Sequence, residues 1–244
     1  MKVIDLFSGI GGFCLGLEST GGFETIKFVE NNEWCQKVLA KNFPGVPIIG
    51  DIKDYEGQKA DVVTGGFPCQ PFSIPGKRKG TDDNRHLWSE MLRVIKASKP
   101  RWCIGENVRN LTSIENGMVF EQVCTDLENE GYEVQSFIIP ASAVNAPHQR
   151  YRVWIMGWKS DSSDECQKRE VQERKNSESC RTSRLSKFKN ESWWGVEPSV
   201  GRVANGIPRR VDRFKGLGNA IVPQIAYQIG LAILEAENET QQRF

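Results

Sequence analysis

Short apolar segments alternate with segments of helical periodicity over the first half of the chain. Strand-like runs lie at residues 2–7, 25–31, 46–51, 60–67 and 101–108, and between them helical patterns span residues 13–20, 32–43 and 87–100. In the last of these, Leu87, Met91, Val94 and Ile95 recur at the spacing of one helix face. Strands that alternate with helices at these intervals predict parallel βαβ units and a doubly wound α/β sheet.

The pattern changes after a predicted helix over residues 117–131, which ends at Gly131. Two strand-like runs follow, at residues 132–140 and 151–159, with only a loop between them. Consecutive strands without an intervening helix predict an antiparallel end to the mainly parallel sheet. An amphipathic helix over residues 220–238 is expected near the end of the chain.

Composition limits the class of protein. The 244 residues are 39% hydrophobic and 26% charged, with a net charge of +1, which is typical of an ordinary globular protein. No run approaches the about 20 apolar residues of a membrane span, and the start of the chain lacks the pattern of a secretory signal, so we expect a cytoplasmic protein. The 7 cysteines form no CxxC pairs, and we therefore expect neither a disulfide framework nor a metal site.

A glycine-rich turn and two carboxylates mark one edge of the predicted sheet. The stretch "DLFSGIGG", residues 5–12, falls at the first strand-to-helix turn, where a doubly wound sheet opens its ligand crevice. Glu30 and Asp51 end the second and third predicted strands at the same edge. An acidic side chain in the position of Glu30 can accept hydrogen bonds from ribose hydroxyls. A nucleotide site is predicted, and the alternative for the glycines alone is a tight turn with close helix packing.

Cys69 is framed by prolines in "GGFPCQPFS", residues 65–73, directly after a strand. Prolines fix the backbone angle φ, so they hold the thiol rigidly at the end of the strand. Taken alone, a cysteine is as often a small packed hydrophobe. Together with Glu106 and Arg152 at other strand ends, it indicates a thiol presented for chemistry.

Seven segments along the chain together resemble the DNA cytosine-5 methyltransferase family. The matching segments, in order, are "DLFSGIGG", "FVEN", "GDI", "GGFPCQPFS", "GENV", "QRYRVWIMG" and "GLGNAIVPQ". The resemblance implies a Rossmann-like class I methyltransferase fold that binds S-adenosyl-L-methionine and releases S-adenosyl-L-homocysteine, with no metal. One departure is Asn31, where many relatives have an aromatic residue that stacks on adenine.

The resemblance also implies a set of cofactor residues. In that reading Glu30 holds the ribose, Asp51 and Ile52 border the adenine, and the C-terminal motif completes the pocket. The full predicted set is Asp5, Phe7, Ser8, Gly9, Ile10, Gly11, Glu30, Asn31, Asp51, Ile52, Pro68, Leu87, Asn219 and Ala220.

The family's chemistry assigns roles to five residues. Cys69 is the expected nucleophile toward C6 of cytosine, because C5 becomes nucleophilic only after that attack. Glu106 is expected to contact N3 and the exocyclic amine of the base, and a raised pKa would suit it. Asn107 is expected to hold the loop, while Arg150 and Arg152 position the base or its phosphate. The target base is expected to be flipped out of the duplex.

Basic residues supply candidate contacts to nucleic acid. "PGKRKG", residues 75–80, follows the cysteine, and a second group of arginines lies in "GRVANGIPRR", residues 201–210. For the second group the alternative is an irregular scaffold segment whose arginines pair with acids. The predicted nucleic-acid residues are Gln70, Ser73, Lys77, Arg78, Lys79, Arg202, Arg209 and Arg210.

The catalytic domain is expected to comprise residues 1–158 and 215–244, with a small, partly flexible target-recognition region at 159–214. Residues 159–192 contain almost no large apolar side chains. The resulting prediction is a monomeric enzyme that methylates C5 of cytosine in double-stranded DNA, and the sequence leaves open whether a restriction endonuclease is its partner. Two alternatives stay open, which are methylation of cytosine in transfer RNA and a non-catalytic DNA-binding protein.

Overall fold

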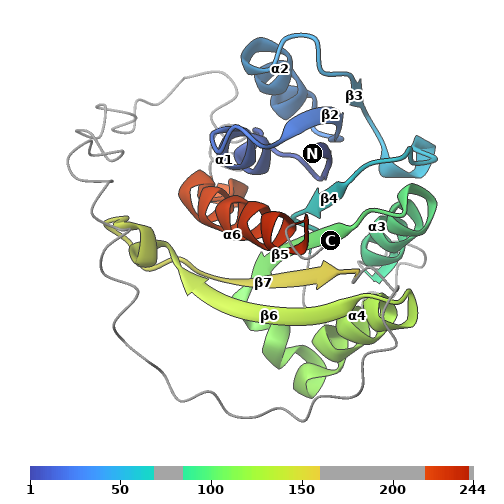
Figure 1. Cartoon of the computed structure of the whole chain (residues 1–244), viewed down its shortest axis with the longest axis vertical. Coiled ribbons are helices and arrows are strands. Elements are labelled where there is room, and N and C mark those ends of the chain that lie inside the picture. The colour runs from blue at the N-terminus through green and yellow to red at the C-terminus, as the bar shows by residue number, and fades with distance from the viewer. Residues whose placement is uncertain (69–84, 160–217, 242–244) are drawn as a thin grey trace, which may run out of the picture. The chain divides into compact units, whose positions relative to one another are not determined.

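The computed structural model describes residues 1–68, 85–159 and 218–241, which build a mixed α/β sheet of seven strands (Figure 1). The strands are β1 (Lys2–Leu6), β2 (Glu24–Val29), β3 (Ile48–Ile49), β4 (Val62–Gly65), β5 (Trp102–Val108), β6 (Glu133–Pro140) and β7 (Tyr151–Trp158). The helices are α1 (Gly12–Glu18), α2 (Glu33–Asn42), α3 (Arg85–Ser98), α4 (Met118–Asn129) and α6 (Pro223–Gln241). Three short 3₁₀ segments lie at Ile52–Asp54, Arg109–Gly117 and Ala141–Val144.

The strand order is β3-β2-β1-β4-β5-β7-β6. Strands β1 to β5 pair in parallel, β7 runs antiparallel to β5, and β6 runs antiparallel to β7. The predicted parallel sheet with an antiparallel end is therefore confirmed. The order reverses between β1 and β4, and in open α/β sheets ligands bind beyond the carboxyl ends of the strands at such a reversal.

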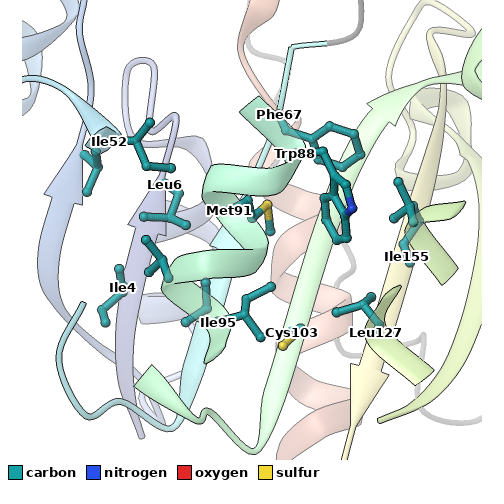
Figure 2. Close-up of a cluster of buried hydrophobic side chains, with 14 of the residues drawn as sticks. Ile4, Leu6, Ile52, Phe67, Trp88, Met91, Ile95, Cys103, Leu127 and Ile155 are labelled. Atoms are coloured by element: carbon teal, nitrogen blue, oxygen red, sulfur yellow. The ribbon is translucent and has the colours of Figure 1, made fainter. Parts of the chain in front are cut away.

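Helices cover both faces of the sheet. On one face α3 and α4 pack against β1, β4, β5 and β7, and Figure 2 shows Trp88, Met91 and Ile95 of α3 directed at this core. On the other face α1 and α6 pack through Phe13 and Ile233 among others. Both faces of the central strands are thus buried, which explains why their sequences are continuous apolar runs rather than alternating ones.

Glycines allow α6 to lie very close to α1. A Cβ atom on Gly16 of α1 would lie 2.7 Å from the Cβ of Ala226 in α6, and one on Gly12 would lie 2.9 Å from the carbonyl oxygen of Ile221. On the α6 side, a Cβ on Gly230 would lie 3.0 Å from the Leu17 side chain. Only residues without a side chain fit here, so the C-terminal helix is seated directly beside the helix that follows the glycine turn.

Local signals explain where several helices begin and end. The side chain of Asn32 caps α2 by accepting a hydrogen bond from the backbone N–H of Cys35 at 3.0 Å. Gly131, at a φ of +81°, follows α4 in the left-handed conformation that its sequence position predicts. In the part of the chain described by the structure, no helix combines the length and apolar character needed to span a membrane.

Candidate active site at the carboxyl edge of the sheet

The turn after β1 takes a conformation that favours glycine. The backbone φ is +52° at Phe7, +56° at Gly9 and +87° at Gly11, all in the left-handed region. The Ser8 hydroxyl donates a 2.6 Å hydrogen bond to the carbonyl oxygen of Asp5, which closes the turn. The turn therefore exposes its backbone at the strand-order reversal, in front of helix α1.

Glu30 extends from the end of β2 and fastens this turn. One carboxylate oxygen accepts a 2.7 Å hydrogen bond from the N–H of Gly9, and the other accepts a 2.7 Å hydrogen bond from the N–H of Asn32. Burial raises the pKa of Glu30, while these backbone donors oppose the rise. The predicted ribose carboxylate thus joins the glycine turn to the start of α2.

A cavity of about 450 Å³ opens at this edge of the sheet. Its volume falls in the range of about 300–1,000 Å³ that small-molecule sites occupy. The residues predicted for the cofactor that line it are Phe7, Ser8, Gly9, Glu30, Asn31, Asp51, Ile52, Pro68, Leu87, Asn219 and Ala220. Glu106, Asn107 and Arg152 line the same cavity, so the predicted cofactor residues and the predicted catalytic carboxylate share one space.

Glu106 lies on β5 as a buried carboxylate with an arginine partner. Arg152 Nε donates to Glu106 Oε1 at 2.9 Å from the neighbouring strand β7. Burial raises the pKa of Glu106 to about 7, although Arg152 and Arg150 act to lower it. A carboxyl group with such a pKa carries a proton in part of the molecules near neutral pH, so it can exchange that proton with a bound base.

Asn107 connects β5 to the segment that precedes Cys69. Its Nδ2 donates a 2.8 Å hydrogen bond to the carbonyl oxygen of Phe67, and its Oδ1 accepts one of 2.8 Å from the N–H of Val108. Pro68, the residue before Cys69, lines the cavity. The Asn107 side chain, which is predicted to hold the loop, therefore binds the backbone two residues before Cys69, the predicted nucleophile.

Arg150 contacts the segment that precedes α6, and its expected contact with the base or its phosphate stays a prediction. Its Nη2 donates a 2.8 Å hydrogen bond to the carbonyl oxygen of Ala220, a cavity-lining residue. Burial lowers the pKa of Arg150, with a further contribution from Arg152. The sequence predicts contact with the base or its phosphate, whereas this guanidinium contacts the C-terminal wall of the cavity.

Three predicted cofactor residues are not among the described residues that line the cavity. Ile10 and Gly11 belong to the far side of the turn, and Asp5 is fully buried within the sheet. Asp5 Oδ1 accepts a 2.6 Å hydrogen bond from the Thr64 hydroxyl on β4, while Oδ2 has no partner. Burial raises the pKa of Asp5 to about 7, and the nearby Glu30 adds to the rise. Its place is beneath the site rather than on its surface.

The remaining predicted site residues lie outside the described residues. They are Cys69, Gln70, Ser73, Lys77, Arg78, Lys79, Arg202, Arg209 and Arg210. Most of the expected recognition region, at 159–214, also lies outside them.

The cavity includes residues that the sequence interpretation missed. Gly66 lines it, and a Cβ there would lie 3.3 Å from Glu106 Oε2, so the absence of a side chain leaves room for the carboxylate. Asn32 and Ile221 line it as well. A signal existed for Asn32, which is the residue type that caps a helix, but nothing local distinguishes Ile221 from a core residue.

No cluster of His, Cys, Asp and Glu suited to a metal ion occurs within residues 1–68, 85–159 and 218–241. The cavity instead presents a buried carboxylate beside a glycine turn at the strand-order reversal, a combination that fits an adenosine-containing molecule.

Comparison with known proteins assigns the family. The family model described as C-5 cytosine-specific DNA methylase matches residues 1–200. The chain belongs to this family.

Among curated relatives, the Type II methyltransferase M.Bsp6I of Bacillus sp. (strain RFL6) is 36% identical over 166 residues, which are 66% of this chain and 53% of that protein. The Type II methyltransferase M.HhaI of Haemophilus parahaemolyticus is 35% identical over 168 residues, which are 66% of this chain and 50% of that protein. The chain thus spans about half the length of the curated relatives it matches.

The structure of the S. pombe Dnmt2 methyltransferase resembles this chain with a TM-score of 0.57. The match covers 65% of this chain and 51% of that one at 23% identity, a level that shows a shared fold.

Proposed function

We propose that this chain transfers a methyl group from S-adenosyl-L-methionine to C5 of cytosine in duplex DNA. The observation that carries the proposal is the shared cavity, where the buried Glu106, whose pKa is raised to about 7, lies with the Glu30-fastened glycine turn. Glu106 suits a nucleobase that accepts a proton, and the glycine turn with Glu30 suits an adenosine. Membership of the C-5 cytosine-specific DNA methylase family supports the same reaction.

The cofactor end of the cavity would bind the adenosyl group. Glu30 would hold the ribose, Asp51 and Ile52 would border the adenine, and Asn219 and Ala220 would complete the pocket. When bound, S-adenosyl-L-methionine supplies an electrophilic methyl group on its sulfonium. The residues of the chain orient the donor and exclude water from it.

At the other end of the cavity, the proposed reaction begins with Cys69. Its thiolate forms a bond to C6 of the cytosine, and Glu106 gives its proton to N3, so the ring keeps no net negative charge. The electron pair released from the C5–C6 double bond makes C5 nucleophilic. After methylation, a base removes the C5 proton, the C5–C6 double bond re-forms as the S–C6 bond breaks, and N3 returns its proton to Glu106, so the Cys69 thiolate and the Glu106 acid are both regenerated.

Neighbouring residues support these two groups. Arg152 lies 2.9 Å from Glu106, and its positive charge lowers the pKa of that carboxyl, which burial raises. Glu106 can therefore still lose its proton. Asn107 fixes the Phe67 carbonyl and thereby positions the segment that leads to Cys69. Because the reacting atoms of a base stacked within a duplex are out of reach, the target cytosine would be flipped out, at a cost of a few kcal/mol.

We infer that residues 159–214 contribute target recognition, and that Arg202, Arg209 and Arg210 contact DNA there. These assignments stay predictions of the sequence, as does the monomeric state, and a restriction endonuclease partner stays an open question.

The test is transfer of labelled methyl to unmethylated duplex DNA and, in parallel, to transfer RNA, with the wild-type chain and Cys69→Ala. We expect label at cytosine C5 of DNA, and no label with the variant. Label only in RNA would keep the mechanism and change the substrate. Label that persists in Cys69→Ala would refute the nucleophile, and no label in either substrate would refute the proposed activity for this chain alone.

A further inference from the structure

The C-terminal wall of the cavity is formed by residues that are far from the rest of the site in sequence. Asn219, Ala220 and Ile221 line the cavity together with Glu30 and Asp51. They directly precede α6, so their place depends on what fastens this segment to the sheet. The structure shows two such fastenings, which are close packing beside Gly12 and a hydrogen bond from Arg150.

Packing alone restrains only one end of the segment. A Cβ on Gly12 would lie 2.9 Å from the carbonyl oxygen of Ile221, so α1 touches the wall from the side of the glycine turn. Ala220, one residue earlier, is held from the opposite side, where the Arg150 guanidinium donates to its carbonyl oxygen at 2.8 Å. The two contacts together form a clamp that holds the wall between α1 and the residue that precedes β7.

Arg150 is placed for this contact by its backbone. It directly precedes β7, and its φ of +24° lies in the left-handed region that is rare outside glycine. Arg152, two residues on, turns its guanidinium to Glu106 instead. The two arginines of "QRYR" therefore divide between the cofactor wall and the catalytic carboxyl.

We propose that Arg150 is a positioning residue for the cofactor site, which holds the wall formed by Asn219, Ala220 and Ile221 so that binding of an adenosyl methyl donor depends on it even without DNA. The inference deepens the proposed function and rests on it. It differs from the sequence prediction, in which Arg150 acts on the target base or its phosphate and the affinity for the donor alone would not depend on it.

The test measures binding of S-adenosyl-L-methionine and S-adenosyl-L-homocysteine to the full chain by calorimetry in the absence of DNA. Arg150→Met removes the N–H groups that donate the hydrogen bond and keeps the apolar part of the side chain, and Arg150→Lys keeps one group that can donate a hydrogen bond. The control is Arg109→Ala, which removes an arginine that stacks on Tyr151. We expect Arg150→Met to weaken binding of both molecules by about tenfold or more, Arg150→Lys to recover part of the affinity, and Arg109→Ala to bind as wild type.

S-adenosyl-L-methionine carries a positive sulfonium that S-adenosyl-L-homocysteine lacks, so a comparison of the two shows whether the effect of Arg150 depends on ligand charge. A wall contact is shared by both molecules, so both affinities should fall by a similar factor. If Arg150→Met instead binds both with wild-type affinity while DNA binding falls, Arg150 acts on the nucleic acid and the proposal is overturned.

Hydrogen exchange tests the clamp without any ligand. In Arg150→Met, backbone amides of residues 219–226 should exchange faster than in the wild type, whereas those of β2 should not change. If the wild-type chain bound neither ligand, the proposed function would fail, but this comparison would still judge Arg150. Equal exchange rates in both proteins would refute the clamp.

Discussion

Glu106 and Arg152 form the pair on which the proposed chemistry depends most at the level of single residues. The carboxyl is buried, and its arginine partner is 2.9 Å away. Burial dominates over the arginine, so the pKa of Glu106 is raised to about 7 rather than lowered. A buried carboxyl that exchanges a proton near neutral pH can act as a proton donor to N3 of the target base.

Replacement of Glu106 by Gln tests this role. Gln keeps the shape of the side chain but has no acidic proton, so kcat for methyl transfer is expected to fall by a factor of about 10²–10⁴. Calorimetric binding of S-adenosyl-L-methionine should change little, because the proposed role of Glu106 is toward the target base and not toward the adenosyl group. The wild-type rate should also decline as the pH rises above about 7, where Glu106 loses its proton. A variant with wild-type kcat would contradict the assignment.

Asp5 gives a prediction about stability. The folded-state pKa, raised to about 7 from 3.8, means that the folded chain holds this proton more tightly than the unfolded chain does. The contribution of Asp5 to the free energy of unfolding is therefore fully present below about pH 4 and is lost as the pH rises to about 7.

Asp5→Asn should remove this dependence, because the amide cannot ionise. Urea unfolding across this range should show the wild type losing stability relative to the variant, by up to about 1.4 kcal/mol per pH unit. Parallel stability profiles for the two proteins would show that Asp5 does not bind its proton more tightly in the folded state.

The residue scale also shows the limits of inference from sequence. Glu30 and Glu106 line one cavity, and the sequence indicated that they lie near each other because both occur toward the carboxyl ends of apolar strands at a shared edge; their roles stay predictions. The contact of Arg150 with Ala220 could not be predicted, since it joins residues 70 positions apart and depends on a single backbone angle. The burial of Asp5 was missed because its carboxyl faces into the sheet toward Thr64 of a neighbouring strand.

At the level of elements, the interface between α1 and α6 links the C-terminal helix to the cavity. Gly12 and Gly16 on α1 face Ile221 and Ala226, without space for side chains. This explains the second part of "DLFSGIGGFCLG". Its early glycines make the turn, for which nucleotide binding stays a prediction, whereas the close-packing alternative holds for Gly12 and Gly16.

A substitution of Gly16 by Ala should therefore be costly. The added methyl group would lie 2.7 Å from the Ala226 Cβ, which requires the helices to separate. We expect a loss of about 1–3 kcal/mol in the free energy of unfolding, measured with urea. Leu15→Ala is the matched control on the same helix, because Leu15 is 49% exposed, and it should cost much less. Equal losses in the two variants would argue against the close interface.

The strands and helices themselves were largely predictable. Each predicted strand and helix in the described residues occurs, because apolar runs and helical periodicity are local signals. The strand order was not predictable in detail, because pairing of β1 with β4 depends on segments about 60 positions apart. The antiparallel end was predicted, since two strands without a helix between them leave few other connections.

At the scale of the whole molecule, a single cavity serves both the proposed cofactor and the proposed target base. The residues that line the cavity include those at the carboxyl ends of β1, β2, β3 and β4, residues of β5, β7 and α3, and the segment before α6, and the strand order brings them together. The chain spans about half the length of the curated relatives it matches. Target recognition by residues 159–214 accordingly remains a proposal that DNA-binding measurements must support.

The measurement that tests the central claim most directly is covalent trapping on a DNA duplex whose cytosines carry fluorine at C5. The fluorine cannot leave as a proton, so the S–C6 bond cannot be broken after methylation. With S-adenosyl-L-methionine present, we predict a denaturation-resistant complex in which peptide mapping finds the DNA on Cys69, and no complex with Cys69→Ala. Attachment at another residue, or no complex with a wild-type chain that binds the methyl donor, would contradict the account.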